Sequence, residues 1–252
     1  MFDWLFSPSC PCDLAAKEWI EERLAWLAEE FDDGAFNGRR IVRPTPEFFP
    51  DPYDGSKKAV RQLLDRVCEY MDVVPDLVEL KFVSDSGKIW NVEGFAQPGA
   101  AGTYEEGEHG FIIRINREGL DDTVGLVGTM AHELAHVRLL GESRILRETF
   151  DNEILTDLTT IHFGLGVFLA NTPRNWDDQL GYGKWPGTRL KKPEYMTPPM
   201  FGWALAHLAW FRGETRPDWA KDLTGAARAN LDQGIRYLAA TGDSTYRPAR
   251  HR

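Results

Sequence analysis

HELAH, at residues 132–136, lies within an apolar run over residues 123–140 whose spacing predicts an α-helix. Residues four apart share one face of a helix, so His132 and His136 can bind the same metal ion. Glu133 projects to the flank of that face, where its carboxylate can accept and release a proton. The stretch therefore predicts a metal site with a general base beside it.

A metal ion that performs chemistry takes three protein ligands and keeps one position for water. A second apolar run, residues 152–170, predicts another helix, and its first turns carry Glu153 and Asp157 four positions apart. One carboxylate can then reach the metal while the other orients a ligating imidazole. Glu153 has a simpler explanation as well, because glutamate in the first turn of a helix is favoured by the helix dipole.

Two other residues compete for the place of third ligand. Glu142 follows His136 by six positions and is the main alternative to Glu153. His162 lies nine positions after Glu153, which turns it to the opposite face of the predicted helix and indicates a histidine of the core or of an interface.

With HExxH on one helix and ExxxD on the next, residues 111–170 resemble the gluzincins, the thermolysin-like clan of zinc metallopeptidases. The resemblance implies zinc held by His132, His136 and Glu153, with Glu133 as general base. It also implies that Asp157 is the partner of a ligating imidazole. The short interval between the two motifs indicates a compact, minimal member. The metzincin pattern is excluded, because it requires glycine at 139 and histidine at 142.

The ligand set predicts the reaction class. Two neutral imidazoles and one carboxylate leave zinc with a net charge of about +1, which lowers the pKa of its bound water. Glu133 would take the proton as the water attacks a carbonyl and would pass it to the leaving amine. We therefore expect hydrolysis of a peptide or protein substrate. Gluzincins commonly stabilise the oxyanion with a His or Tyr from the C-terminal part, which makes Tyr195 and His207 candidates.

Other classes of function compete with this reading. A regulatory or immunity-type interaction protein with a zincin-like fold could bind zinc without turnover, although a structural zinc has no need of Glu133. A helical interaction module without any metal is the second rival.

The fold class expected is α+β: a predominantly helical, zincin-like domain with a small mixed or antiparallel sheet next to the metal helix. Apolar periodicity predicts further helices at residues 13–31, with the acidic side outward, and at 57–71, 200–211 and 226–239. We expect a single domain, residues 1–252, with an N-terminal helical part (1–75), a core (76–170) and a C-terminal helical part (171–252).

Three strands are expected before the metal helix. Residues 77–83 and 88–92 flank the turn cluster Asp85-Ser86-Gly87 and predict a hairpin. The third strand, residues 111–116, places Phe111, Ile113 and Ile115 on one face. In gluzincins the strand that borders the cleft pairs with an extended substrate, and the sequence leaves open whether residues 111–116 form an edge or a central strand.

Composition restricts the partners. The net charge of −10 argues against nucleic acid and anionic membranes, because both require clustered Lys and Arg. No apolar run approaches the roughly 20 residues of a membrane span, and residues 1–12 do not resemble a signal peptide, so we expect a cytoplasmic protein. The three cysteines agree with a reducing compartment. Cys10 and Cys12 could join a metal site only with further ligands, and two ordinary thiols is the simpler interpretation.

Overall fold

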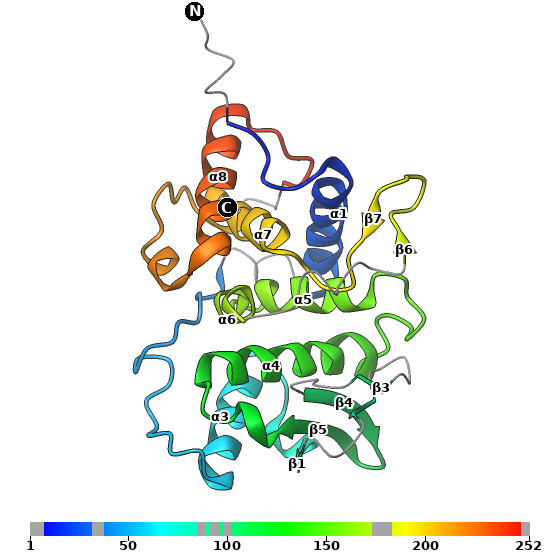
Figure 1. Cartoon of the computed structure of the whole chain (residues 1–252), viewed down its shortest axis with the longest axis vertical. Helices are drawn as coiled ribbons and strands as arrows, with labels where there is room; N and C mark the ends of the chain where they lie inside the picture. The colour runs from blue at the N-terminus through cyan, green and yellow to red at the C-terminus, as the bar shows by residue number, and fades with distance from the viewer. Residues whose placement is uncertain are drawn as a thin grey trace, which may run out of the picture. The chain divides into compact units, whose positions relative to one another are not determined.

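The computed structural model describes residues 8–31, 38–84, 89–90, 96–97, 102–172 and 183–247 (Figure 1). The chain divides into two compact units, Val42–Asn152 and Met1–Ile41 together with Glu153–Arg252. Helices predominate, and the unit Val42–Asn152 contains a small mixed sheet, which confirms the α+β class. The division of the whole chain into a single domain with three successive parts stays a prediction.

The sheet of the unit Val42–Asn152 has three strands in the order β1-β5-β4. Their bounds are Val78–Val83 for β1, Gly102–Gly107 for β4 and Gly110–Asn116 for β5. Strand β5 runs parallel to β1, with Leu80 opposite Ile113, and antiparallel to β4, with Tyr104 opposite Ile113. Because β5 is the central strand, both of its edges are already paired, and an extended substrate cannot be added to it.

The predicted hairpin between residues 77–83 and 88–92 is wrong. Strand β1 pairs with β5, whereas β2 (Ile89–Trp90) pairs with β3 (Ala96–Gln97) in a separate two-stranded sheet. The turn cluster Asp85-Ser86-Gly87 lies outside the described residues. The hairpin that does form joins β4 and β5 through the two residues between Gly107 and Gly110.

Two helices of the same unit pack against each other, α3 (Lys57–Tyr70) and α4 (Thr123–His136), and α4 also packs against β4. The N-cap of α4 is Asp122, whose Oδ1 accepts the Gly125 N–H at 3.0 Å. The α-helix ends at His136 and continues as a single π-helical turn, Val137–Gly141. The predicted helix over residues 123–140 is therefore present, with a change of helix type immediately after the second histidine.

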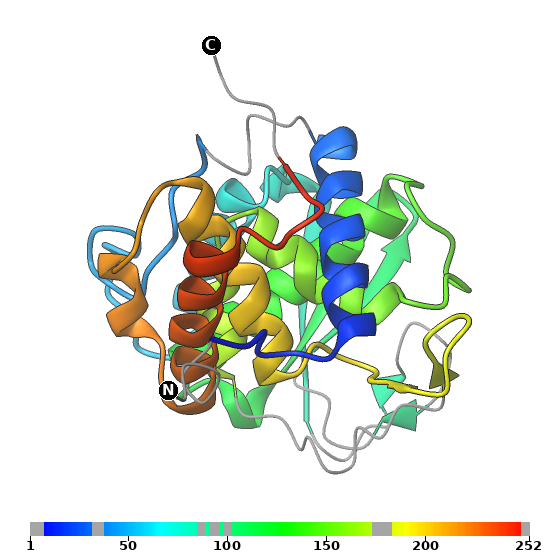
Figure 2. The same cartoon turned by 90° about the horizontal axis from the view of Figure 1, so that it is seen from above.

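The other unit is helical. Its main helices are α1 (Leu14–Phe31), α5 (Asn152–His162), α6 (Gly166–Asn171), α7 (Pro198–Phe211) and α8 (Gly225–Thr241). Helices α7 and α8 lie side by side, and α1 packs on α7 (Figure 2). A short pair of strands, β6 (Gly183–Lys184) and β7 (Lys191–Lys192), precedes α7. No helix among the described residues is long and apolar enough to cross a bilayer.

The predicted apolar run over residues 152–170 is split into α5 and α6. Gly164, between them, has φ +86°, and a Cβ there would lie 2.3 Å from the Arg40 carbonyl oxygen. Only glycine adopts this conformation without strain while the backbone of another segment approaches so closely. The break thus follows from one residue and one neighbouring backbone carbonyl.

Helix α1 buries part of its predicted acidic side. Glu21 is 1% exposed, and its Oε2 accepts hydrogen bonds from the Thr245 backbone N–H at 2.8 Å and hydroxyl at 2.7 Å. Lys17 lies 3.1 Å from Glu21 Oε1. A buried carboxylate is tolerated when it is paired and hydrogen-bonded in this way. The expectation of an outward-facing acidic side fails at Glu21 because its partners come from the far end of the chain.

Candidate metal centre

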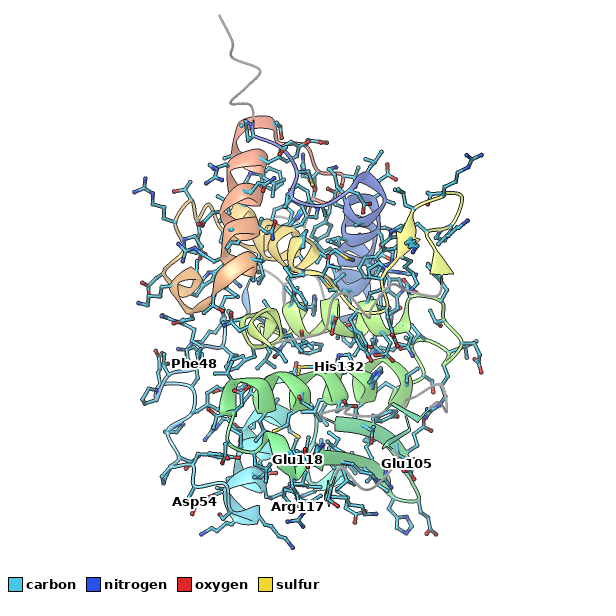
Figure 3. All side chains as sticks on the ribbon, in the orientation of Figure 1. Phe48, Asp54, Glu105, Arg117, Glu118 and His132 are labelled. Carbon is cyan, nitrogen blue, oxygen red and sulfur yellow. The ribbon has the colours of Figure 1, made fainter. Side chains whose placement is uncertain are left out.

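Helix α4 brings the two histidines of the HELAH stretch onto one face. The rings of His132 and His136 lie with centroids 4.9 Å apart and planes at 89°. Both are buried, at 7% and 1% exposure. Figure 3 shows His132 on this helix and Glu105 on strand β4 of the same unit. The i, i+4 spacing therefore produces the juxtaposed imidazoles that it predicts.

A carboxylate completes the group. Ligand atoms of His132, His136 and Glu153 all lie within 4.8 Å of one another. Glu153 stands in the first turn of α5 and follows directly after Asn152, the last residue of the unit Val42–Asn152. Two imidazole nitrogens and one carboxylate oxygen are the donors that zinc takes in hydrolases, with a fourth position for water. The chemistry of the donor set therefore fits zinc.

Glu142 is engaged elsewhere. Its carboxylate is exposed and lies 3.1 Å from Arg138 and 2.9 Å from Arg144. Within the described residues, Glu142 is not part of the three-residue group that could hold a metal ion. Of the two carboxylates, Glu153 is therefore the one that lies close to both histidines, and its role as the third ligand stays a prediction.

Glu133 lies where α4 meets strand β4. It is 6% exposed, and a Cβ built on Gly102, the first residue of β4, would lie 3.2 Å from Glu133 Cγ. The same Cβ would lie 2.6 Å from Thr129 Cγ2, closer than real Cβ atoms approach. Glycine at position 102 therefore lets the strand lie directly against the helix turn that carries Glu133.

Tyr104 is a residue of the site that the sequence did not reveal. Its ring stacks on His136 with centroids 5.9 Å apart and planes at 25°, and its hydroxyl donates to Glu106 Oε1 at 3.3 Å. The Arg147 guanidinium forms a salt bridge with the same Glu106 oxygen, with an N–O distance of 2.9 Å. Burial is the main cause that raises the pKa of Tyr104, so the phenol stays protonated and keeps donating. The strand itself was not predicted, so no sequence signal pointed to this contact.

Asp157 is fully buried on α5, one turn after Glu153. Its Oδ2 accepts the Met196 backbone N–H at 2.9 Å, which ties the segment before α7 to α5. Tyr195, the half-buried candidate for the oxyanion, is the residue preceding Met196. The contact of Asp157 with a ligating imidazole, and the role of Tyr195, stay predictions.

His207 has the surroundings of a core histidine. It is fully buried on α7, with Nδ1 donating to the Trp203 carbonyl at 3.0 Å and Nε2 accepting from the Ser244 hydroxyl at 2.9 Å. Burial lowers its pKa to about 4, so the ring is neutral at pH 7. His162 is likewise buried, with its ring 5.6 Å from that of Phe31 and 5.4 Å from that of Phe163. The role of His207 as an oxyanion stabiliser stays a prediction.

Comparison with known proteins adds no relative from which a role could be transferred: no family model, curated protein or solved structure matches the chain. The candidate centre consequently depends on its own residues and their geometry.

Proposed function

We propose that this chain is a zinc-dependent metallopeptidase of the gluzincin type that hydrolyses peptide bonds. The observation that carries the proposal is the group of His132, His136 and Glu153, whose ligand atoms lie within 4.8 Å of one another. Zinc bound there would supply a polarised water of lowered pKa. The other contributions to the reaction come from residues of the chain.

Glu133 is the proposed general base. A carboxylate directly after the first ligand of an i, i+4 pair lies on the flank of the ligand face, within reach of a water held by that face. Glu133 is buried, so its carboxylate is largely shielded from bulk water. Its electrostatic interaction with a bound water is then stronger than it would be in solvent, which favours proton transfer between the two. Glu133 would accept the proton of the attacking water and then donate it to the amine that leaves.

Strand β4 is the proposed docking edge for substrate. It is an outer strand of the three-stranded sheet, and its first residue, Gly102, lies against Thr129 and Glu133 of α4. An extended peptide that added to an outer strand would be held by backbone hydrogen bonds, with little demand on its side chains. Such a peptide would pass beside the proposed base.

The test compares wild type with Glu133→Gln on a diverse library of unstructured peptides, at equal zinc loading. Glutamine keeps the shape and can hydrogen-bond water but cannot accept the proton, so the rate should fall by roughly 10²- to 10⁴-fold while zinc is retained. Glu142→Gln is the matched control, because Glu142 is paired with arginines outside the metal group.

Each outcome has a defined reading. Cleavage by wild type and by Glu142→Gln, but not by Glu133→Gln, supports the peptidase. Equal cleavage by all three indicates a contaminating protease. Zinc binding without cleavage by any variant contradicts the peptidase and favours the non-catalytic zinc-binding interaction protein.

A further inference from the structure

The described thiols outside the metal centre include a close pair. Cys10 and Cys12 are free and half-buried, and their Sγ atoms lie 3.7 Å apart. The third free cysteine, Cys68, is fully buried on α3 in the other unit. The metal centre uses none of the three thiols, so the close pair needs its own explanation.

The backbone on both sides of the pair is anchored. The Gln233 side chain, from α8, donates to the carbonyl oxygens of Ser9 at 3.1 Å and Cys10 at 3.4 Å. Cys12 immediately precedes Asp13, whose Oδ1 accepts the Ala16 N–H at 2.9 Å and so caps α1. The ring of Pro11 restricts the one residue between the cysteines. These contacts anchor the backbone on both sides of Pro11, so the two cysteines do not lie on a free segment.

The two thiols are electrostatically unequal. The two sulfur atoms lie within hydrogen-bond distance, and either thiol can donate. The hydrogen bond with Cys12 is the largest cause that lowers the pKa of Cys10; burial opposes it, and the charge of Lys17 adds to it. The same hydrogen bond, together with burial, raises the pKa of Cys12. Thiolate is the reactive form of cysteine, so Cys10 is the nucleophile of the pair.

We propose that Cys10 and Cys12 form a redox-active dithiol, which a small-molecule disulfide such as oxidised glutathione converts to an intramolecular disulfide. Cys10 thiolate attacks one sulfur of the small disulfide, forms a mixed disulfide and releases one thiolate, which takes up a proton. Cys12 then loses its proton and attacks Cys10 Sγ, which releases the second thiol. Two electrons pass from the protein dithiol to the small disulfide, which is thereby reduced to two thiols.

The short separation of the cysteines makes this bond a reversible one. A loop closed over a single residue removes little entropy from the unfolded chain, and a strained or exposed disulfide has a more oxidising potential than a structural one. The dithiol is therefore the resting form in a reducing compartment, and the disulfide forms when the ratio of oxidised to reduced glutathione rises.

The test uses the full chain, equilibrated with oxidised glutathione, alkylated and digested with trypsin. Both thiols fall in one peptide, residues 1–17, and Cys68 falls in another, residues 67–81, which serves as an internal control. We expect peptide 1–17 to lose two hydrogens and to carry neither alkyl group nor glutathione. Peptide 67–81 should become alkylated only after denaturation, because burial raises the pKa of Cys68 to about 12.

Two variants identify the steps. Cys12→Ser should stop at the mixed disulfide, with one glutathione on Cys10, because the resolving thiol is missing. Cys10→Ser removes the hydrogen bond that contributes most to the raised pKa of Cys12, but burial still raises that pKa. The variant should therefore react with oxidised glutathione more slowly than wild type and should form no intramolecular disulfide. Full alkylation of both thiols in wild type, or a mixed disulfide that does not proceed to the intramolecular bond, overturns the proposal.

Discussion

The contact between strand β4 and helix α4 gives a prediction whose size follows from the structure. Gly102→Ala would place a Cβ 2.6 Å from Thr129 Cγ2, and 3.2 Å from both the Arg114 carbonyl oxygen and Glu133 Cγ. The first distance requires the strand, the helix or the Thr129 side chain to shift, whereas the other two are tight contacts that a small adjustment relieves. Overpacking of this kind costs about 1–3 kcal/mol in the free energy of unfolding.

The clash can be removed from the other side. Thr129→Ala deletes the methyl group that the new Cβ would meet, and alanine favours a helix over threonine by up to about 0.7 kcal/mol, so this change alone should be nearly neutral. In the double variant only the 3.2 Å contacts remain. We expect the two substitutions to couple by about 1–2 kcal/mol, with most of the cost of Gly102→Ala recovered.

Urea unfolding of the four proteins, wild type, both single variants and the double variant, measures the coupling. The same proteins should be assayed for peptide hydrolysis, because a shift of the helix turn that carries Glu133 by about 1 Å can cost roughly 10²-fold in rate. A Gly102→Ala protein as stable as wild type would refute the close approach of strand and helix. The close approach would also be refuted if Gly102→Ala lowered the free energy of unfolding by the same amount in wild type and in the Thr129→Ala protein.

Three further predictions concern residues around the centre and in the core. Asp157→Asn should weaken zinc affinity by roughly 10- to 100-fold without abolishing the fold, and unchanged affinity in a competition titration would count against its assigned role. Tyr104→Phe should leave zinc affinity unchanged because the ring on His136 is kept, whereas Tyr104→Ala should weaken it by roughly tenfold; equal affinities for both variants would show that the ring does not position His136. Burial lowers the pKa of His207 from 6.5 in the unfolded chain to about 4 in the folded protein. Between these pH values the unfolded chain binds a proton at His207 that the folded protein does not. The free energy of unfolding therefore has its full value above pH 6.5 and falls by roughly 3 kcal/mol as the pH falls to 4. Urea unfolding at pH 7 and pH 4 should show this extra loss in wild type but not in His207→Gln, and parallel losses in the two proteins would contradict it.

The helices could be predicted from the sequence because their information is local. Apolar residues three and four apart place α1, α3, α4, α7 and α8 within a few residues of their ends. The same rule brings the imidazoles of His132 and His136 together, since their spacing alone fixes a shared face. His132 and His136 carry the clearest sequence signal, and the structure confirms that their rings lie next to each other.

The strands could not be predicted as well, because their partners are set by contacts between distant segments. Strand β1 pairs in parallel with β5, and no pattern within residues 77–92 distinguishes that pairing from a hairpin. Strand β4 was missed because Glu105, Glu106 and flanking glycines hide its alternation. With β4 unseen, the contact of Tyr104 with His136 could not be foreseen.

Buried polar groups were equally out of reach of sequence reasoning. Glu21 has the spacing of an exposed glutamate, and its burial depends on Thr245, which is 224 positions away. The sequence alone also could not separate Glu142 from Glu153 as candidate ligands. In the structure Arg138 and Arg144 pair with Glu142, whereas Glu153 lies close to His132 and His136. Local periodicity carries no information on such partners.

The metal content of the purified protein tests the central claim most directly. Wild type expressed in zinc-replete medium and purified without chelators should contain about one zinc per chain. His132→Ala and Glu153→Ala should lose it, whereas Glu142→Ala, the matched carboxylate control, should keep it. A ratio near zero in wild type, or zinc retained in Glu153→Ala and lost in Glu142→Ala, would contradict the assigned centre.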